Sequence, residues 1–253
     1  MRAARRGLVG LNDAKRNHWD LWGIWIVTFG SLIISFPVYT VAAFSLEFDR
    51  KAVADVFALH ITISYWLGIF AALLRLPSLE DWSRFKRIQT VCLTFMIASY
   101  ATHLSWELVW VFLHESISQA KDSMWAYAWW AYIDGGDNRY YNPEANFLMI
   151  EILSVINGTI GLTGLYFLKR SRYRDFRGTL LCMSTAVTHT VLTWYYYGTE
   201  VLTGFESVNI NSFMDLWVKF IFLNGPWLIL PWFVLYWGVQ LLQKQLSIDG
   251  YCQ

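Results

Sequence analysis

Six long apolar runs, spread along the whole chain, constrain this protein more than any other feature of its sequence. They lie at about 22–44, 57–76, 89–113, 146–168, 178–198 and 213–242, each close to the ~20 residues that a helix needs to cross a bilayer. Charged residues make up only 15% of the 253, whereas soluble domains carry about 25%. The sequence therefore predicts an all-α fold, a polytopic transmembrane bundle of about six helices.

Basic residues between these runs predict the orientation. Arginine and lysine gather in the first 21 residues, at 84–87 and at 169–177, whereas the intervening segments are mixed or acidic. Because lysine and arginine are enriched on the cytoplasmic side of a membrane, we expect both termini to be cytoplasmic. We expect the first run to be retained as an anchor, because it is longer than the ~7–15 apolar residues of a cleaved signal peptide.

The predicted organisation is one transmembrane domain, 22–242, between a basic N-terminal arm, 1–21, and a cytoplasmic tail, 243–253. A net charge of +1 argues against nucleic acid as a partner, because binding it requires a basic face. Cys92, Cys182 and Cys252 lie far apart without metal-ligand spacing, which favours neither a zinc site nor a disulfide framework. We therefore expect no metal and no cofactor.

Ionisable side chains within the apolar runs are the candidate functional residues, because charge is costly inside a bilayer and usually serves function there. His103 and Glu107 are four residues apart, so they share one face of a helix. With a rise of 1.5 Å per residue, Glu107 and Glu151 reach similar depths on antiparallel helices. The sequence thus predicts two carboxyls and a histidine in one neighbourhood.

Three further polar or aromatic residues fall at comparable depth. His189 and Asn224 both come out near the middle of the bilayer, and Trp227, three residues after Asn224, lies on the same helical face. Two carboxyls at separate points of a pocket can protonate one carbon and deprotonate another, and a histidine can relay the proton. This cluster therefore favours acid–base chemistry, with His103, Glu107 and Glu151 in the catalytic roles.

Each of these residues also fits a structural role. His103 and Glu107 can bond to each other as helix–helix contacts, and Glu151 can reach interfacial water. His189 stands among threonines that can satisfy its ring, and Trp227 is one of 15 tryptophans that can simply pack. Asp215 and Lys219, four residues apart, favour a local ion pair.

The segment 114–145 is longer than most loops, and long loops often act as lids or binding segments. It is rich in tryptophan and tyrosine, residues that favour the membrane interface. Two interpretations stay open: the segment covers the mouth of a pocket, or it lies along the lipid headgroups.

Four short motifs in order carry a resemblance to a known family. They are the His-x-x-x-Glu of 103–107, the Gly-Asp-Asn-Arg-Tyr of 136–140, Glu151 at a fixed spacing beyond Tyr140, and the Asn-x-x-Trp-Leu-x-Leu-Pro of 224–231. Over residues of about 97–240 the chain resembles the emopamil-binding protein family, sterol Δ8–Δ7 isomerases of the EXPERA superfamily. The chain departs from the family in its basic arm, an extra N-terminal helix and His189.

The resemblance implies an isomerase of the endoplasmic reticulum membrane that moves protons on a sterol-like or terpenoid lipid. It implies that the carboxyls and His103 carry the protons, while Asn224 and Trp227 face a carbocation. Tyr140 and Ser154 would lie near the substrate, as would His189 from its depth. Cationic amphiphiles, which imitate the carbocation, would be further ligands.

Two other functions remain open alongside the isomerase. A membrane terpene cyclase would use the same proton donor and differ in the carbon skeleton of its product. A non-catalytic sterol-binding protein would need the pocket but not the carboxyls. A shared fold alone does not transfer activity. The sequence leaves the oligomeric state open, a homodimer included.

Overall fold

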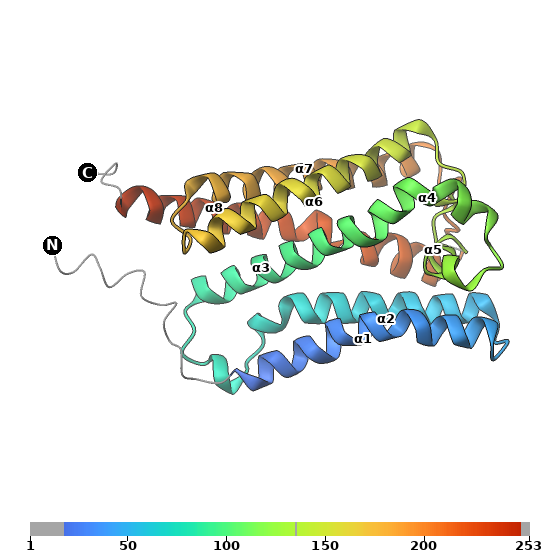
Figure 1. The fold of residues 1–253 in the computed structure, drawn as a ribbon, viewed down its shortest axis with the longest axis horizontal. Helices are drawn as coiled ribbons and strands as arrows, with labels where there is room; N and C mark the ends of the chain where they lie inside the picture. Colours follow the sequence, from blue (N-terminus) through green and yellow to red (C-terminus); the bar gives the residue numbers. More distant parts are fainter. Residues whose placement is uncertain (1–17, 135, 249–253) are drawn as a thin grey trace.

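The computed structural model describes residues 18–134 and 136–248, which form an all-α bundle without strands (Figure 1). Most of the predicted N-terminal arm, the end of the predicted tail and Cys252 lie outside these residues. The long helices are α1 (Trp19–Phe44), α2 (Arg50–Phe70), α3 (Arg84–Thr102), α4 (Leu108–Gln119), α6 (Ala145–Arg170), α7 (Phe176–Leu202) and α8 (Pro226–Ile248). The shorter elements are α5 (Tyr127–Ile133) and the 3-10 turns η3 (Ala71–Leu73), η4 (Pro77–Leu79), η6 (Met124–Ala126) and η7 (Asn138–Tyr140).

Two π-helices extend the long helices. The element η5 (His103–Glu107) joins α3 to α4, and η8 (Met214–Phe222) precedes α8. Five of the six predicted apolar runs fall within long helical segments, and the run 57–76 extends three residues beyond the helical segment that ends at Leu73. Four segments of the described chain are long and apolar enough to cross a membrane, namely Trp19–Phe44, Arg50–Leu73, Ala145–Arg170 and Met214–Ser247. The chain is thus a membrane protein with an all-α bundle fold.

Local sequence explains where several of these helices begin. Asp49 accepts a hydrogen bond from the backbone N–H of Ala52 at 2.8 Å and so caps α2. Asp175 caps α7 in the same way through the N–H of Arg177 at 3.0 Å. Such caps satisfy backbone donors that the first turn of a helix leaves free.

Small residues let the central helices approach closely. A Cβ atom at Gly178 would lie 2.9 Å from the backbone oxygen of Gly164, and one at Gly161 would overlap the Tyr100 ring. Glycine at helix crossings permits tight packing between membrane helices. The crossings bring α6 and α7 together and set α3 against α6.

The long helices run up and down the bundle, so α1 begins and α8 ends at the same end of the molecule (Figure 1). The α3 start and the α6–α7 connection, where the basic loop residues gather, lie at that end too. The segment between α4 and α6 lies at the opposite end. Helices α1 and α2 form a hairpin beside the remaining helices.

Candidate active site

The π-helix η5 carries the first predicted pair. His103 and Glu107 are 2% and 9% exposed, and His103 Nδ1 lies 2.6 Å from Glu107 Oε2. Helix α6 packs closely against this pair: a Cβ atom at Gly158 of α6 would lie 3.0 Å from His103 Cβ. Single π-helical turns within α-helices occur often at functional sites. The pair is therefore held deep in the bundle, with one carboxyl oxygen committed to the histidine.

Helix α6 carries the second carboxyl. Glu151 is 4% exposed, and its Oε1 accepts a hydrogen bond from the Tyr140 hydroxyl at 2.7 Å. Ser154, one turn further along α6, is also buried. Tyr140 belongs to η7, so the long segment before α6 reaches into the site rather than lying wholly along the surface.

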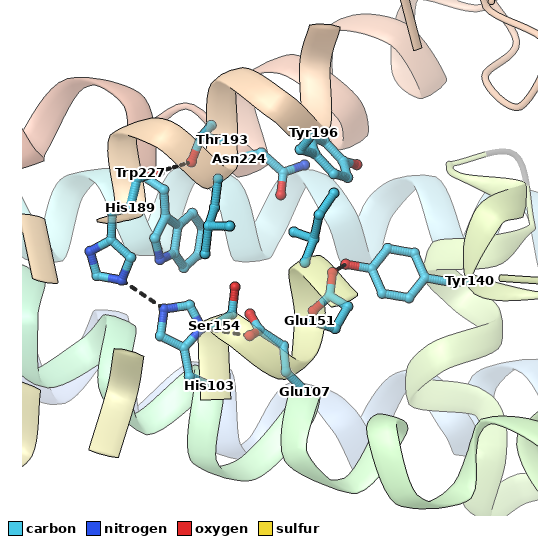
Figure 2. A pocket seen from close by; sticks show the side chains of 12 residues that line it. His103, Glu107, Tyr140, Glu151, Ser154, His189, Thr193, Tyr196, Asn224 and Trp227 are labelled. Atoms are coloured by element: carbon cyan, nitrogen blue, oxygen red, sulfur yellow. Dashed lines mark hydrogen bonds and ion pairs between the residues drawn. The ribbon is translucent and has the colours of Figure 1, made fainter. Parts of the chain in front are cut away.

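The structure brings all eight predicted site residues to the wall of one cavity of about 60 Å³ (Figure 2). They are His103, Glu107, Tyr140, Glu151, Ser154, His189, Asn224 and Trp227. Liquid water occupies about 30 Å³ per molecule, so this polar space is of water size and cannot hold a whole lipid. Both carboxyls point into it (Figure 2).

A second, larger cavity adjoins the first. It measures about 490 Å³ and shares Glu107, Tyr140, Asn224 and Trp227 with the small polar cavity. Its other walls are mainly apolar and come from α1, α2, α3, α5 and the region around α8, including Leu32, Phe36, Phe57, Ala58, Ala98, Ala131 and Leu223. We call this space the apolar chamber. Its volume falls within the ~300–1,000 Å³ of typical small-molecule sites.

The apolar chamber opens between α1 and α3. Ile33 on α1 is 77% exposed. Ala101 at the end of α3 and Ser105 in η5 are exposed as well, and all three residues line the chamber. In a membrane this opening faces the apolar interior of the bilayer, since α1 is one of the apolar helices.

Asn224 and Trp227 stand where the two cavities meet. The Asn224 amide nitrogen donates to Tyr132 Oη at 3.0 Å and to the Phe220 carbonyl at 2.9 Å, which leaves its amide oxygen directed toward the polar cavity (Figure 2). Trp227 stacks on Tyr65 with ring centroids 5.5 Å apart. An amide oxygen and an indole face both favour a positive charge beside them.

Buried charged residues hold the Gly-Asp-Asn-Arg-Tyr motif of 136–140, which positions Tyr140. Asp137 is fully buried and accepts hydrogen bonds from Arg139 Nε at 2.9 Å and from the Tyr196 hydroxyl at 2.8 Å. Arg139 also pairs with Glu200 at 3.5 Å and donates to Thr199 Oγ1 at 3.1 Å. Burial is the largest single effect and opposes the charge on Arg139, but Asp137, Tyr196 and Glu200 together outweigh burial and raise the pKa of the guanidinium.

Sequence reasoning missed several residues of this neighbourhood. Ser99 lies within 3.1 Å of His103 Nε2, and its position four residues before His103 was a usable signal. Tyr132 and Tyr196, whose hydroxyls are 2.9 Å apart, gave no such signal, because their place depends on how α5 and α7 pack. Leu192 and Thr193 complete the wall from α7.

The predicted Asp215–Lys219 pair is present but is part of a larger ring. Lys219 Nζ lies 3.1 Å from Asp215 and 2.7 Å from Asp55, and Lys51 Nζ lies 2.6 Å from Asp215 and 3.0 Å from Asp55. We call these four residues the ion ring. It ties α2 to η8, the element that leads into Asn224.

Within the described residues, no group of three or more His, Cys, Asp or Glu side chains is placed to hold a metal ion. Cys92 and Cys182 are free and buried. No protein-family model matches the chain, and no solved structure matches it either.

Proposed function

We propose that the protein is a membrane isomerase that shifts a carbon–carbon double bond in a sterol-like or terpenoid lipid. One observation carries the proposal: two buried carboxyls, Glu107 and Glu151, line a polar cavity that adjoins a larger apolar chamber. Moving protons on a carbon skeleton requires acidic and basic groups beside the reacting carbons and an apolar space that holds the rest of the lipid.

The reaction divides between the two carboxyls. One gives its proton to an alkene carbon, which leaves a carbocation on the neighbouring carbon. The other removes a proton from a carbon next to the cation, and the electrons of that C–H bond form the new double bond. Substrate and product have the same formula. Positioned acids and bases of this kind contribute about 10²–10⁴-fold to a rate.

The surrounding residues suit the cationic intermediate. The Asn224 oxygen and the Trp227 ring lie beside the carboxyls, and neither can react with the cation as a strong base. His103 holds Glu107 at 2.6 Å, and Tyr140 holds Glu151 at 2.7 Å, which directs one oxygen of each carboxyl. Ser154 and His189 complete the polar wall.

The lipid body occupies the apolar chamber in this proposal, with its reacting end at the junction formed by Glu107, Tyr140, Asn224 and Trp227. We infer from the four sequence motifs that the chain belongs with the emopamil-binding protein family. We also infer a location in the endoplasmic reticulum membrane. Cationic amphiphiles would compete with the lipid because they carry the charge of the intermediate.

Turnover by purified protein in lipid nanodiscs tests the proposal. Wild type and the Glu107→Gln/Glu151→Gln double variant are incubated with Δ8-sterols and with terpenoid alkenes, and products are identified by mass spectrometry and NMR. We expect a double-bond isomer from wild type only. A product with new rings would make the protein a cyclase, and binding without any product would make it a lipid-binding protein.

The number of membrane crossings is a separate prediction. We propose six crossings with both termini cytoplasmic, because α1 begins and α8 ends at one end of the bundle and the basic loops gather there. Tags at each terminus are probed for protease access in sealed microsomes. Tags on opposite sides would contradict an even number of crossings.

A further inference from the structure

His189 lies directly behind the catalytic pair rather than only beside the substrate. Its Nε2 is 2.9 Å from His103 Nε2, and its ring is 2% exposed. The Tyr100 ring stacks on it with centroids 5.9 Å apart, and Phe95 packs edge-on at 5.8 Å. The two histidines and Glu107 thus form an unbroken row of hydrogen-bonding atoms: carboxyl, Nδ1, Nε2 and Nε2 (Figure 2).

The hydrogen bond between Trp227 and Ser99 determines which hydrogen bonds Ser99 can make to the two histidines. An indole nitrogen can only donate, and Trp227 Nε1 donates to Ser99 Oγ at 2.7 Å. The Ser99 hydroxyl proton is therefore free to donate to a histidine. Ser99 Oγ lies 3.1 Å from His103 Nε2 and 3.3 Å from His189 Nε2, so it can serve whichever of the two nitrogens lacks a proton.

The short contact between the two Nε2 atoms requires one proton between them, which permits two neutral arrangements of the rings. In the loaded arrangement Glu107 carries a proton and donates to His103 Nδ1, and the Nε2–H of His103 donates to His189. In the unloaded arrangement the Nδ1–H of His103 donates to the Glu107 carboxylate, and the Nε2–H of His189 donates to His103. The loaded row holds one more proton than the unloaded row.

We propose that His189 reloads Glu107 with a proton between turnovers, acting through His103. Water gives one proton to His189 Nδ1, the proton on His189 Nε2 passes to His103 Nε2, and the proton on His103 Nδ1 passes to Glu107. Each N–H bond that breaks is matched by one that forms, and neither ring becomes an imidazolium. The other carboxyl returns one proton to water in each cycle, so the protons balance. Run in reverse, the same steps discharge Glu107.

This inference rests on the proposed isomerase and deepens it, since a carboxyl that gives a proton to carbon must regain one. The titratable groups facing His189 are His103 and Glu107 from η5 and Tyr100 from α3. Across the polar cavity they are Glu151 from α6, Tyr140 from η7 and Tyr196 from α7. Helix α8 contributes the uncharged Trp227, which contacts His103 and Ser99. A purely structural histidine would need only one of the two proton arrangements, whereas a relay must visit both.

The kinetic test separates the first turnover from the later ones. In His189→Gln the amide keeps hydrogen bonding but cannot pass a proton by switching tautomer. We expect the first turnover to remain within about twofold, and steady-state turnover to fall by roughly 10²-fold, the low end of the acid–base range. His114→Gln, the same change in a histidine of α4 outside the row, should leave both rates unchanged.

A second variant protects the test against misfolding. His189→Ala leaves room for free imidazole, which should restore the steady-state rate when added to the buffer. An equal loss of the first and later turnovers in His189→Gln, without rescue of His189→Ala by imidazole, would assign His189 a structural role and overturn the relay.

A spectroscopic test does not depend on turnover. Nitrogen-15 NMR of histidine-labelled protein in nanodiscs, with His189→Gln for assignment, reports which ring nitrogen carries the proton. As pH is varied, we expect His103 and His189 to switch tautomer together, and Glu107→Gln to abolish the joint switch. A His189 that gains a second proton alone would overturn the relay. If the joint switch is present but wild type turns over no lipid, the relay stands and the isomerase proposal fails.

Discussion

The two adjoining cavities differ in size, in lining and in the helices that build them. The polar cavity, about 60 Å³, is lined by carboxyls, histidines and hydroxyls from η5, η7, α6 and α7, and by Trp227 of α8. The apolar chamber, about 490 Å³, is lined mainly by alanine and aromatic side chains and receives one wall from the α1–α2 hairpin. Glu107, Tyr140, Asn224 and Trp227 belong to both.

Under the proposed function, this difference predicts that the reaction and the selection of the substrate depend on separate parts of the molecule. Changes in the polar cavity should alter the rate at which a bound lipid reacts. Changes in the apolar chamber should alter which lipid binds and how tightly. The four shared residues should affect both, and variants on either side of the junction can test whether the division holds.

The largest effect is expected for the two carboxyls taken singly. Glu107→Gln and Glu151→Gln should each lower turnover by at least ~10²-fold, while lipid affinity stays close to wild type because an amide keeps the shape of the side chain. Glu115→Gln and Glu144→Gln, the same change at exposed positions of the chain, are the matched controls. Turnover at the wild-type rate in both buried variants would remove the acid–base assignment.

The next effect concerns the indole at the junction. Trp227→Leu should weaken the binding of a cationic amphiphile by about 30-fold, because a desolvated cation–π contact is worth up to ~2 kcal/mol. Trp227→Phe keeps an aromatic face and should lose less.

Both substitutions also remove the hydrogen bond to Ser99, so Ser99→Ala measures that loss separately with the indole in place. Calorimetric titration of the amine against the four proteins gives the comparison. Equal affinity in all of them would place the bound cation away from Trp227.

Much of this arrangement could be predicted from the sequence, and the reasons are physical. Apolar runs of helical length fixed where the long helices lie, and a spacing of four residues put His103 and Glu107 on one face. Equal depth on antiparallel helices brought Glu151 to Glu107. These inferences need only the repeat of a helix and the thickness of a bilayer.

The remainder depends on how the helices pack, which no local pattern encodes. The partnership of Ser99 with His103, His189 and Trp227 joins three helices. The π-helices η5 and η8 have more residues per turn than an α-helix, and nothing in their amino-acid composition predicts this. The share of α1 in the apolar chamber follows from its contact with α2 rather than from its own sequence.

A smaller effect is expected when the apolar chamber is narrowed. Ala101→Leu adds bulk at the opening between α1 and α3, where Ala101 is exposed and lines the chamber. Overfilling a packed apolar site costs about 1–3 kcal/mol, so lipid affinity should fall roughly tenfold, while the reaction rate of bound lipid is kept. Val109→Phe is the control, because Val109 is exposed on α4, which continues from α3 through η5, and does not line the chamber. A lower rate with unchanged affinity would contradict the division.

The smallest effect should come from Lys51, the outer member of the ion ring, because its side chain is half-exposed. Lys51 has 43% of its side chain exposed, whereas Lys219 is fully buried, although both contact Asp55 and Asp215. Exposed ion pairs contribute about 0.2–1 kcal/mol, but breaking a buried pair costs about 3–5 kcal/mol because a charge is left without its partner. Lys51→Met should therefore lower the free energy of unfolding in mixed micelles by less than ~1 kcal/mol and leave turnover unchanged.

Lys219→Met, the same substitution at the inner position of the ion ring, should lower the free energy of unfolding several-fold more. It should also loosen η8, which positions Asn224, so its residual activity should fall. Equal effects of the two variants would show that the ring does not couple the α1–α2 hairpin to the polar cavity.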